Sequence, residues 1–201
     1  MHNTSPPPAP HELVSALMQA RQTTLPKRLA DPGPSAAELE HIVGAAAHAP
    51  DHGQLLPWRF VRVPAAQREP LADVFAAALL DRDSSATPEE VAQARSKAHR
   101  SPVLLLVVVD GCRGDAQIDL HERLLSAGCA VQNMLLMATA LGYGSALTSG
   151  KALKYAGLRA LFGLTEGEHA VCFVSLGTVQ SRRSPRLRPC SSDYCSTLGE
   201  D

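Results

Sequence analysis

Two histidines and the only tryptophan of the chain lie in one segment, 47–63, with the sequence AHAPDHGQLLPWRFVRV. His48 and His52 have the i, i+4 spacing that lets two imidazoles on one helix face share a metal ion. Pro50 lies between them, and proline interrupts a helix, so a shared face is not expected. The motif H-E-x-x-H is absent. We therefore predict no metal site and expect a loop that leads into a strand.

Motifs for nucleophilic catalysis and for nucleotide binding are also missing. The segment 142–150, GYGSALTSG, is not the nucleophile motif G-x-S-x-G, because the spacing around Ser145 fails. No phosphate-binding loop G-x-x-x-x-G-K-[ST] occurs, and GYG alone is too short for a dinucleotide fingerprint. We therefore assign no side chain as a catalytic nucleophile, acid or base.

A group of cationic, amide and hydroxyl side chains follows the first predicted helix: Arg21, Gln22, Thr23, Thr24, Lys27 and Arg28. A phosphate group is bound by cationic forks and by hydroxyl or amide donors of this kind. A solvated basic loop explains the same residues without any ligand. Position alone does not decide between these two interpretations.

Length, composition and charge limit the class of protein. The 201 residues fit one domain, and a hydrophobic content of 45% is enough for a core. The net charge of −1 gives no electrostatic reason to expect binding to nucleic acid or to an anionic membrane. We find no apolar run of membrane-spanning length and no signal peptide, so we expect a cytoplasmic protein.

The cysteines do not indicate a disulfide framework. Their number is five, and no C-x-x-C pair is present. Cys129 and Cys172 lie in apolar runs and are expected to be inert core thiols. Cys190 and Cys195 lie in a polar tail, where exposed thiols without a role are favoured over a redox pair.

Hydrophobic periodicity predicts an α+β domain over residues 11–180, preceded by a disordered Pro-rich segment 1–10 and followed by a polar tail 181–201. We predict helices at 11–20, from Ser35 to Pro50, and at 71–80, 88–99, 118–141 and 151–162. Strands are predicted at 59–63, 102–110 and 169–178, with a short one inside 142–150. The run PVLLLVVVD is typical of a central strand that is covered on both faces.

The longest predicted helix points to a second subunit. Its second half, SAGCAVQNMLLMATAL, is small or apolar nearly all round. Such a helix must be covered on every side, which one small domain rarely achieves. We therefore expect a homodimer.

Three segments in chain order resemble the nitroreductase family, in particular its branch of small proteins named NAD(P)H nitroreductases. They are RQTTLPKRLADPGPSAAELEHIVGAAAHAPDHGQLLPWRFVRV, SAGCAVQNMLLMATALGYGSALTSG and FVSLGTVQ, and they span residues 21–180. The resemblance implies a central, mostly antiparallel sheet flanked by helices and an intertwined homodimer with two FMN molecules at its interface. It implies electron transfer from NAD(P)H through FMN to a small nitroaromatic or quinone acceptor, by a ping-pong mechanism.

The resemblance also implies which residues contact the flavin. The family's R-R-S phosphate site corresponds to Arg21, Gln22 and Thr23. Its flavin contacts near the A-P-D-H motif correspond to His48 and His52. A further segment of the family, which reaches the flavin of the opposite subunit's site, corresponds to Ser145, Ala146 and Leu147. The loop 48–58 would then wrap the flavin edge, and Trp58 is expected to be a core residue.

Two departures from the family pattern bear on function. Gln22 replaces an arginine, and a charged hydrogen bond is worth about 1.5–3 kcal/mol. FMN would bind about ten- to a hundredfold more weakly unless Lys27, Arg28 or a tail arginine compensates. Leu147 replaces the usual tryptophan and opens space by the ring.

These departures leave alternatives open. The chain could be a flavin carrier or sensor without turnover, or a member specialised in flavin breakdown or substrate dehydrogenation. Neither Arg59 nor Arg123 can be assigned to a nucleotide phosphate from sequence. The four arginines of the tail are expected to face water rather than a cofactor phosphate: Arg182, Arg183, Arg186 and Arg188.

Overall fold

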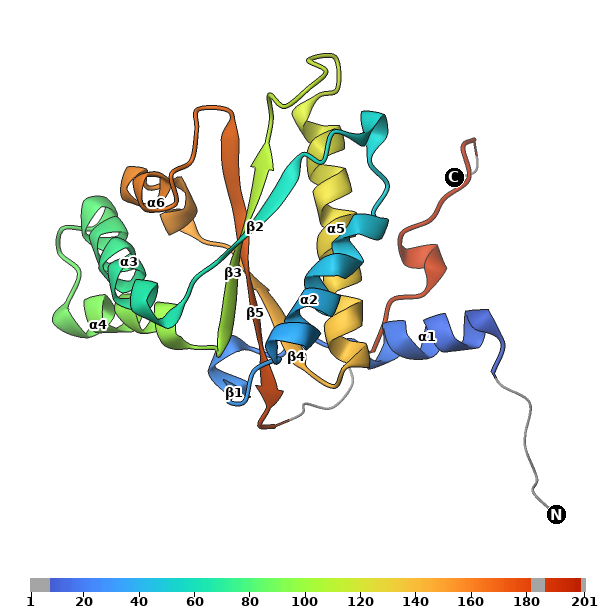
Figure 1. The fold of residues 1–201 in the computed structure, drawn as a ribbon, viewed down its shortest axis with the longest axis horizontal. Coiled ribbons are helices and arrows are strands. Elements are labelled where there is room, and N and C mark those ends of the chain that lie inside the picture. The colour runs from blue at the N-terminus through green and yellow to red at the C-terminus, as the bar shows by residue number, and fades with distance from the viewer. Residues whose placement is uncertain (1–7, 182–186, 200–201) are drawn as a thin grey trace.

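An antiparallel sheet of five strands forms the middle layer of the computed structural model, which describes residues 8–181 and 187–199 (Figure 1). The longest strand, β5, pairs with β1, β3 and β4, and β2 pairs with β3. All of these pairings are antiparallel, which confirms the predicted fold class. The strands are β1 Leu29–Ala30, β2 Trp58–Arg62, β3 Val103–Asp110, β4 Gly144–Thr148 and β5 Glu168–Val179.

Helices cover both faces of this sheet. Helices α3, α4 and α6 lie on one face, α2 and α5 lie on the other, and α1 projects from the body near the C-terminal end of α5 (Figure 1). The helices are α1 Pro10–Ala20, α2 Ala36–Gly44, α3 Arg68–Arg82, α4 Pro88–Ser96, α5 Leu120–Ala140 and α6 Ala156–Leu161. No helix in the described ranges has the length and hydropathy needed to cross a membrane.

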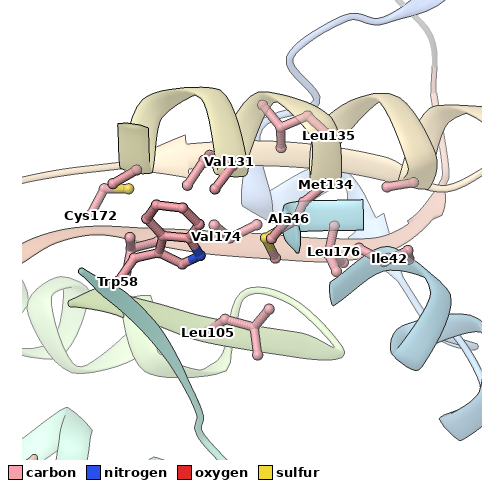
Figure 2. Packing of buried hydrophobic residues seen from close by; sticks show 14 of the residues in the cluster. Ile42, Ala46, Trp58, Leu105, Val131, Met134, Leu135, Cys172, Val174 and Leu176 are labelled. Carbon is pink, nitrogen blue, oxygen red and sulfur yellow. The ribbon is translucent and has the colours of Figure 1, made fainter. Parts of the chain in front are cut away.

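The main core lies between the sheet and α5 (Figure 2). Trp58 packs there and is only 6% exposed, so its interpretation as a core residue is confirmed. Val131 and Met134 of α5 meet Val174 of β5 in the same cluster. Because side chains alternate along a strand, β3 gives every second residue to this core, including Leu105.

A second core lies between the sheet and α3. The other residues of β3, including Leu104 and Leu106, pack there with Leu71 and Phe173. The rings of Phe75 and Phe173 meet edge to face, with centroids 5.7 Å apart. Both faces of β3 are therefore buried, as its continuous apolar sequence predicts.

Most predicted helices have somewhat different boundaries in the structure, and two of the differences are large. The helix that begins at the capping box of Ser35 and Glu38 ends at Gly44, and a 3-10 turn, Ala45–His48, follows it. Ala49, directly before Pro50, is extended, as a residue before proline should be. The predicted helix 151–162 is split into a 3-10 turn, η6 Lys151–Lys154, and α6, because the backbone of Tyr155 is extended.

One side of α5 has no cover from the described residues. The buried side faces the sheet and α2, whereas Leu125 on the opposite side is 72% exposed. Gly128 and Gln132 follow Leu125 at helical spacing and are also exposed. Helix α1 has no buried residue, and Leu13 and Met18 on it are each more than half exposed. The chain thus leaves apolar surface on the two helices that lie furthest from α3 and α4.

Candidate functional site

A cleft of about 340 Å³ lies where the end of α1, the end of α5 and the start of β4 come together. Three arginines line it, Arg21, Arg28 and Arg188. Hydroxyl groups of Thr23, Thr24, Thr139, Tyr143 and Ser181 add polar surface, and Gln22 also lines the cleft. No Asp or Glu is among the lining residues of the described chain. The cleft is therefore a cationic site that can bind an anion.

Short backbone contacts hold the Arg21–Thr24 segment against β4. Thr23 forms a parallel bridge with Ser145, and the amide of Thr24 donates to the carbonyl oxygen of Ser145 at 2.9 Å. Gly144 permits this approach, because a Cβ on it would lie 2.7 Å from a methyl group of Val179 and 3.1 Å from Thr24 Oγ1. The structure thus brings together two of the three groups of predicted flavin contacts.

Two guanidinium groups share the cleft. Arg188 Nη2 donates to the backbone carbonyl oxygen of Arg21 at 3.1 Å. Burial lowers the pKa of Arg21, and the positive charge of Arg188 lowers that pKa further. An anion bound between the two groups would remove this repulsion. Arg188 is exposed, as the tail arginines are expected to be, and it also lines the cleft; Arg182, Arg183 and Arg186 lie outside the described residues.

The β4 residues contribute unequally to the surface. Ser145 and Ala146 are each 2% exposed, so their side chains are packed inside the chain. Leu147 is 45% exposed and is the one of the three whose side chain can meet a ligand. In the register of the sheet it pairs with Val174, near the middle of β5. A ligand would therefore meet Ser145 and Ala146 mainly through their backbone.

The two histidines lie at the opposite end of α5. His52 Nδ1 is 2.8 Å from Oε2 of Glu122, which is in the first turn of that helix. His48 is exposed, and the hydroxyl of Ser126 donates to the carbonyl oxygen of Pro50 between the two histidines. The 21 residues of α5 extend over about 30 Å. Within one chain, His52 therefore lies at the end of α5 opposite to the arginine cleft.

The structure shows no metal centre around these histidines. Within the ranges 8–181 and 187–199, no group of three His, Cys, Asp or Glu side chains is placed to hold a metal ion. The nearest acidic partner of His52 is one carboxylate, that of Glu122. His52 and Glu122 are both well exposed, so this contact adds little stability.

Two residues of the cleft, Tyr143 and Thr139, lie in the second segment that resembles the family but were not among the predicted flavin contacts. The hydroxyl of Tyr143 donates to Glu38 Oε2 at 2.9 Å, which raises the pKa of Tyr143. Hydrogen bonds from Ser35 and then from Tyr143 lower the pKa of Glu38. This contact joins α2 to the turn after α5 and fixes one wall of the cleft.

Two arginines that were open candidates for nucleotide binding have structural roles. Arg59 makes a two-point ion pair with Glu168, with Nε–Oε1 and Nη2–Oε2 distances of 2.5 and 3.0 Å. Arg123 is 1% exposed, and its guanidinium donates to the carbonyl oxygens of four residues, Asp110, Arg113, Asp115 and Ile118. Neither guanidinium is therefore available to a nucleotide phosphate.

The cysteines match most of the expectations. Burial raises the pKa of Cys172 to about 11, so its thiol is inert at neutral pH. Cys129 is only half-buried, because it lies at the border of the covered side of α5. Cys190 and Cys195 are exposed, and none of the five cysteines forms a disulfide.

Comparison with known proteins places this architecture in a family. A sequence model of the nitroreductase family matches residues 19–178. A Haemophilus influenzae protein named "Putative NAD(P)H nitroreductase" is 35% identical over 162 residues, which are 81% of this chain and 87% of that protein.

Solved structures share the fold. The nitroreductase-like family protein from Bacillus cereus superposes with a TM-score of 0.78 at 17% identity, over 98% of this chain and 100% of that one. A nitroreductase from Bacteroides fragilis, solved with bound FMN, superposes with a TM-score of 0.69 at 20% identity, over 92% and 97% of the two chains. The sheet, the helical layers and the sequence match lead to one conclusion: this chain belongs to the nitroreductase family.

Proposed function

We propose that the protein is an FMN-dependent oxidoreductase that transfers electrons from NAD(P)H to a small acceptor such as a nitroaromatic or a quinone. The observation that carries this proposal is the cleft between Arg21 and Arg188, which contains three arginines and no carboxylate among its described lining residues. The family and the name of the Haemophilus influenzae relative support an NAD(P)H-linked reaction. The FMN in the Bacteroides fragilis structure supports the choice of cofactor.

The residues of the cleft fit a phosphate group. Arg21, Arg28 and Arg188 supply charged donors, and Thr23 and Thr24 supply hydroxyls. Arg28 and Arg188 compensate for the charge that Gln22 lacks, whereas Lys27 is not among the lining residues. Bound FMN supplies the two-electron chemistry, and the protein orients it and shields it from water.

The FMN site is proposed to be composite, with residues from two subunits. One chain places the phosphate-binding group at the C-terminal end of α5, which is about 30 Å long, whereas His52 lies beside Glu122 in the first turn of that helix. A homodimer that covers the exposed side of α5 brings the histidines of one chain to the arginines of the other. The exposure of Leu125, 72%, supports such an interface. In this arrangement His52 donates toward the flavin, with His48 nearby.

The electron donor and the acceptor are proposed to use the same face of the flavin in turn, which gives ping-pong kinetics. Leu147 lies on the exposed part of β4 and leaves more room there than a tryptophan would. No side chain is required as a nucleophile. Intersecting double-reciprocal lines, which indicate a ternary complex, would contradict the shared face. A cytoplasmic location remains a prediction.

A flavin carrier or sensor without turnover is the second candidate. Gln22 and Leu147 favour it, because both depart from the family pattern at implied flavin contacts. The deciding experiment is an absorbance spectrum of the purified protein with FMN, recorded without oxygen before and after NADH or NADPH. Bleaching of the flavin band supports the enzyme. A band that both nucleotides leave unchanged supports the carrier, and a protein that does not bind FMN contradicts both.

A complementation experiment tests the composite site. Arg21→Gln chains and His52→Ala chains are prepared separately, each as a homodimer with weakened FMN sites, and are then mixed under conditions that exchange subunits. If each site uses Arg21 of one chain and His52 of the other, the mixed dimer contains one intact site and one doubly defective site. FMN titration should then show recovery of wild-type affinity in half of the sites of that dimer. No recovery in mixed dimers shown to form would mean that each site lies within one chain.

A further inference from the structure

The loop that carries His52 into β2 has an unusual backbone. Gly53, Gln54 and Leu56 have φ angles of +69°, +50° and +48°, in the left-handed region. Glycine adopts this region readily, whereas a glutamine or a leucine there costs free energy. Within residues 8–181 and 187–199, Gln54 and Leu56 are the only residues other than glycine with a positive φ. The strained backbone of the described chain is thus confined to one loop.

Packing in the core does not explain this conformation. Leu56 is 48% exposed, and the side chain of Gln54 is also exposed. A strained backbone persists only where other contacts hold it, and such segments are concentrated at sites that bind ligands. Contacts outside the core must therefore fix the loop.

Asp51 makes the contact that closes the loop. Its Oδ2 accepts the backbone amide of Leu56 at 2.7 Å, and its carbonyl oxygen accepts the backbone amide of Gln54 at 3.1 Å. The first of these hydrogen bonds has a charged acceptor and is therefore a strong one. One half-buried residue thus binds both residues that adopt the left-handed conformation.

The segment before α5 supports the loop from the side. A Cβ on Gly114 would lie 2.6 Å from Leu55 Cδ2, so Leu55 packs directly on the backbone of Gly114. A Cβ on Gly53 would lie 3.0 Å from Ile118 Cδ1. The buried guanidinium of Arg123 holds this supporting segment through its carbonyl oxygens. These contacts leave the loop little freedom to change its shape.

We propose that Asp51 is a positioning residue, which holds the loop 52–56 and with it His52 in the conformation that the flavin meets. This inference rests on the proposed function, in which His52 donates toward the flavin. Asp51 acts through its hydrogen bond to Leu56 and does not itself contact the cofactor. A loop that already has its bound shape loses less conformational entropy when FMN binds, so the affinity is higher. The role requires an acceptor oxygen and not a charge.

FMN titration of full-chain variants tests the proposal. Asp51→Ala removes the acceptor and should weaken FMN binding about tenfold. Asp51→Asn loses the same charge but keeps an acceptor oxygen, so its affinity should stay within about twofold of the wild type. Asp83→Ala is the remote control, because Asp83 Oδ1 accepts the amide of Ser85 at 3.1 Å in the turn after α3. It should bind FMN as the wild type does.

Hydrogen exchange in the FMN-free protein examines the hydrogen bond by itself. The amide of Leu56 should exchange at least about tenfold faster in Asp51→Ala than in the wild type, and Asp51→Asn should restore most of the protection. The melting temperatures of the three proteins should agree within about 3 °C, because the loop lies outside the core.

A double-variant cycle shows whether Asp51 acts through His52. If it does, adding Asp51→Ala to His52→Ala should weaken FMN binding by less than about twofold. Adding Asp51→Ala to Arg21→Gln should instead multiply the two losses, because Arg21 binds a different part of the cofactor. Multiplied losses in the first pair would mean that Asp51 does not position His52.

Two other results would overturn the proposal while leaving the proposed function intact. One is an Asp51→Ala protein that binds FMN as tightly as the wild type. The other is an Asp51→Asn protein that binds FMN as weakly as Asp51→Ala, which would mean that the charge and not the hydrogen bond matters. A wild type that does not bind FMN would contradict the proposed function, and the role of Asp51 with it.

Discussion

Arg188 and Arg21, which are 167 positions apart in the chain, meet at the cationic cleft, where Arg188 Nη2 donates to the backbone carbonyl oxygen of Arg21 at 3.1 Å. Through this contact the C-terminal segment lies across the end of α1. The contact places the guanidinium of Arg188 beside that of Arg21, whose pKa is already lowered by burial. Two like charges in one cleft without a carboxylate cost free energy, and this cost falls when an anion binds between them.

Arg188→Gln should weaken FMN binding about tenfold, which corresponds to about 1.4 kcal/mol. The loss is at the lower end for a charged hydrogen bond, because Arg188 is exposed to solvent. Fluorescence titration of FMN at two salt concentrations measures it. Lys27→Gln is the control, because Lys27 is a nearby cation that does not line the cleft. A loss of the same size in both variants would show that only the net charge of the region matters.

Gln22→Arg should strengthen FMN binding by about tenfold, because it adds a charged donor to a cleft that already contains Gln22 in its wall. Without FMN, the Gln22→Arg variant should have a lower melting temperature than the wild type, because the fourth guanidinium repels the three arginines of the cleft. Gln22→Met, which removes the amide without adding charge, should bind FMN no better than the wild type. Unchanged affinity in Gln22→Arg would mean that the phosphate does not lie at this residue.

Leu147→Trp should narrow the range of acceptors. Leu147 is 45% exposed on β4, so a larger side chain can be accommodated without disturbing the core. We expect the KM of bulky quinones to rise at least fivefold, while the KM of a small nitroaromatic and the FMN content change less than twofold. Leu147→Met keeps the volume nearly constant and should leave both KM values unchanged. A uniform fall in kcat for all acceptors would point instead to a displaced flavin.

Much of the fold could be predicted because local sequence and burial agree. The run Val103–Val109 is apolar throughout, and the structure buries both of its faces. The capping box at Ser35 and Glu38 starts a helix as predicted. The break at Tyr155 could not be predicted, because neither proline nor a strong capping residue marks it. There the ring of Tyr155 lies so close to Gly157 that a Cβ on Gly157 would be 2.4 Å from a ring carbon.

The candidate site was predictable only in part. Arg21–Thr23 and Ser145 belong to segments with a recognisable pattern, and the structure joins them through one parallel bridge. The contributions of Arg188 and of Tyr143 depend on contacts over 167 and 105 positions, and no local pattern encodes such contacts. The distance between the histidines and the arginine cleft depends on the length and direction of α5, so it also required the folded chain.

Arg123→Met should destabilise the protein by about 3 kcal/mol, since it leaves several carbonyl oxygens before α5 without their donor. Urea unfolding at neutral pH measures this loss. Arg113→Met is the control, because the side chain of Arg113 is exposed. Equal stability of the two variants would mean that water replaces the guanidinium without cost, and the segment 110–119 would then not depend on Arg123.

The ion pair between Arg59 and Glu168 should make stability depend on pH. Hydrogen bonds from Arg59 lower the pKa of Glu168 to about 2, below its ordinary value of 4.5. The pair therefore stabilises the folded protein above about pH 4.5, and this contribution is lost as the pH falls toward 2. Because the side chain of Arg59 is 42% exposed, we expect Glu168→Gln to lose only about 2 kcal/mol at pH 7.

Urea unfolding of wild type and Glu168→Gln at pH 7, 4 and 3 tests this expectation. The difference in unfolding free energy should fall to less than half of its neutral value at pH 3, because the unfolded carboxylate is by then protonated while the folded one is still charged. Glu69→Gln removes a carboxylate from an exposed ion pair with Arg95 and should cost less than about 0.5 kcal/mol at each pH. A Glu168→Gln difference that stays constant from pH 7 to 3 would show that packing around Glu168, and not its charge, holds β2 to β5.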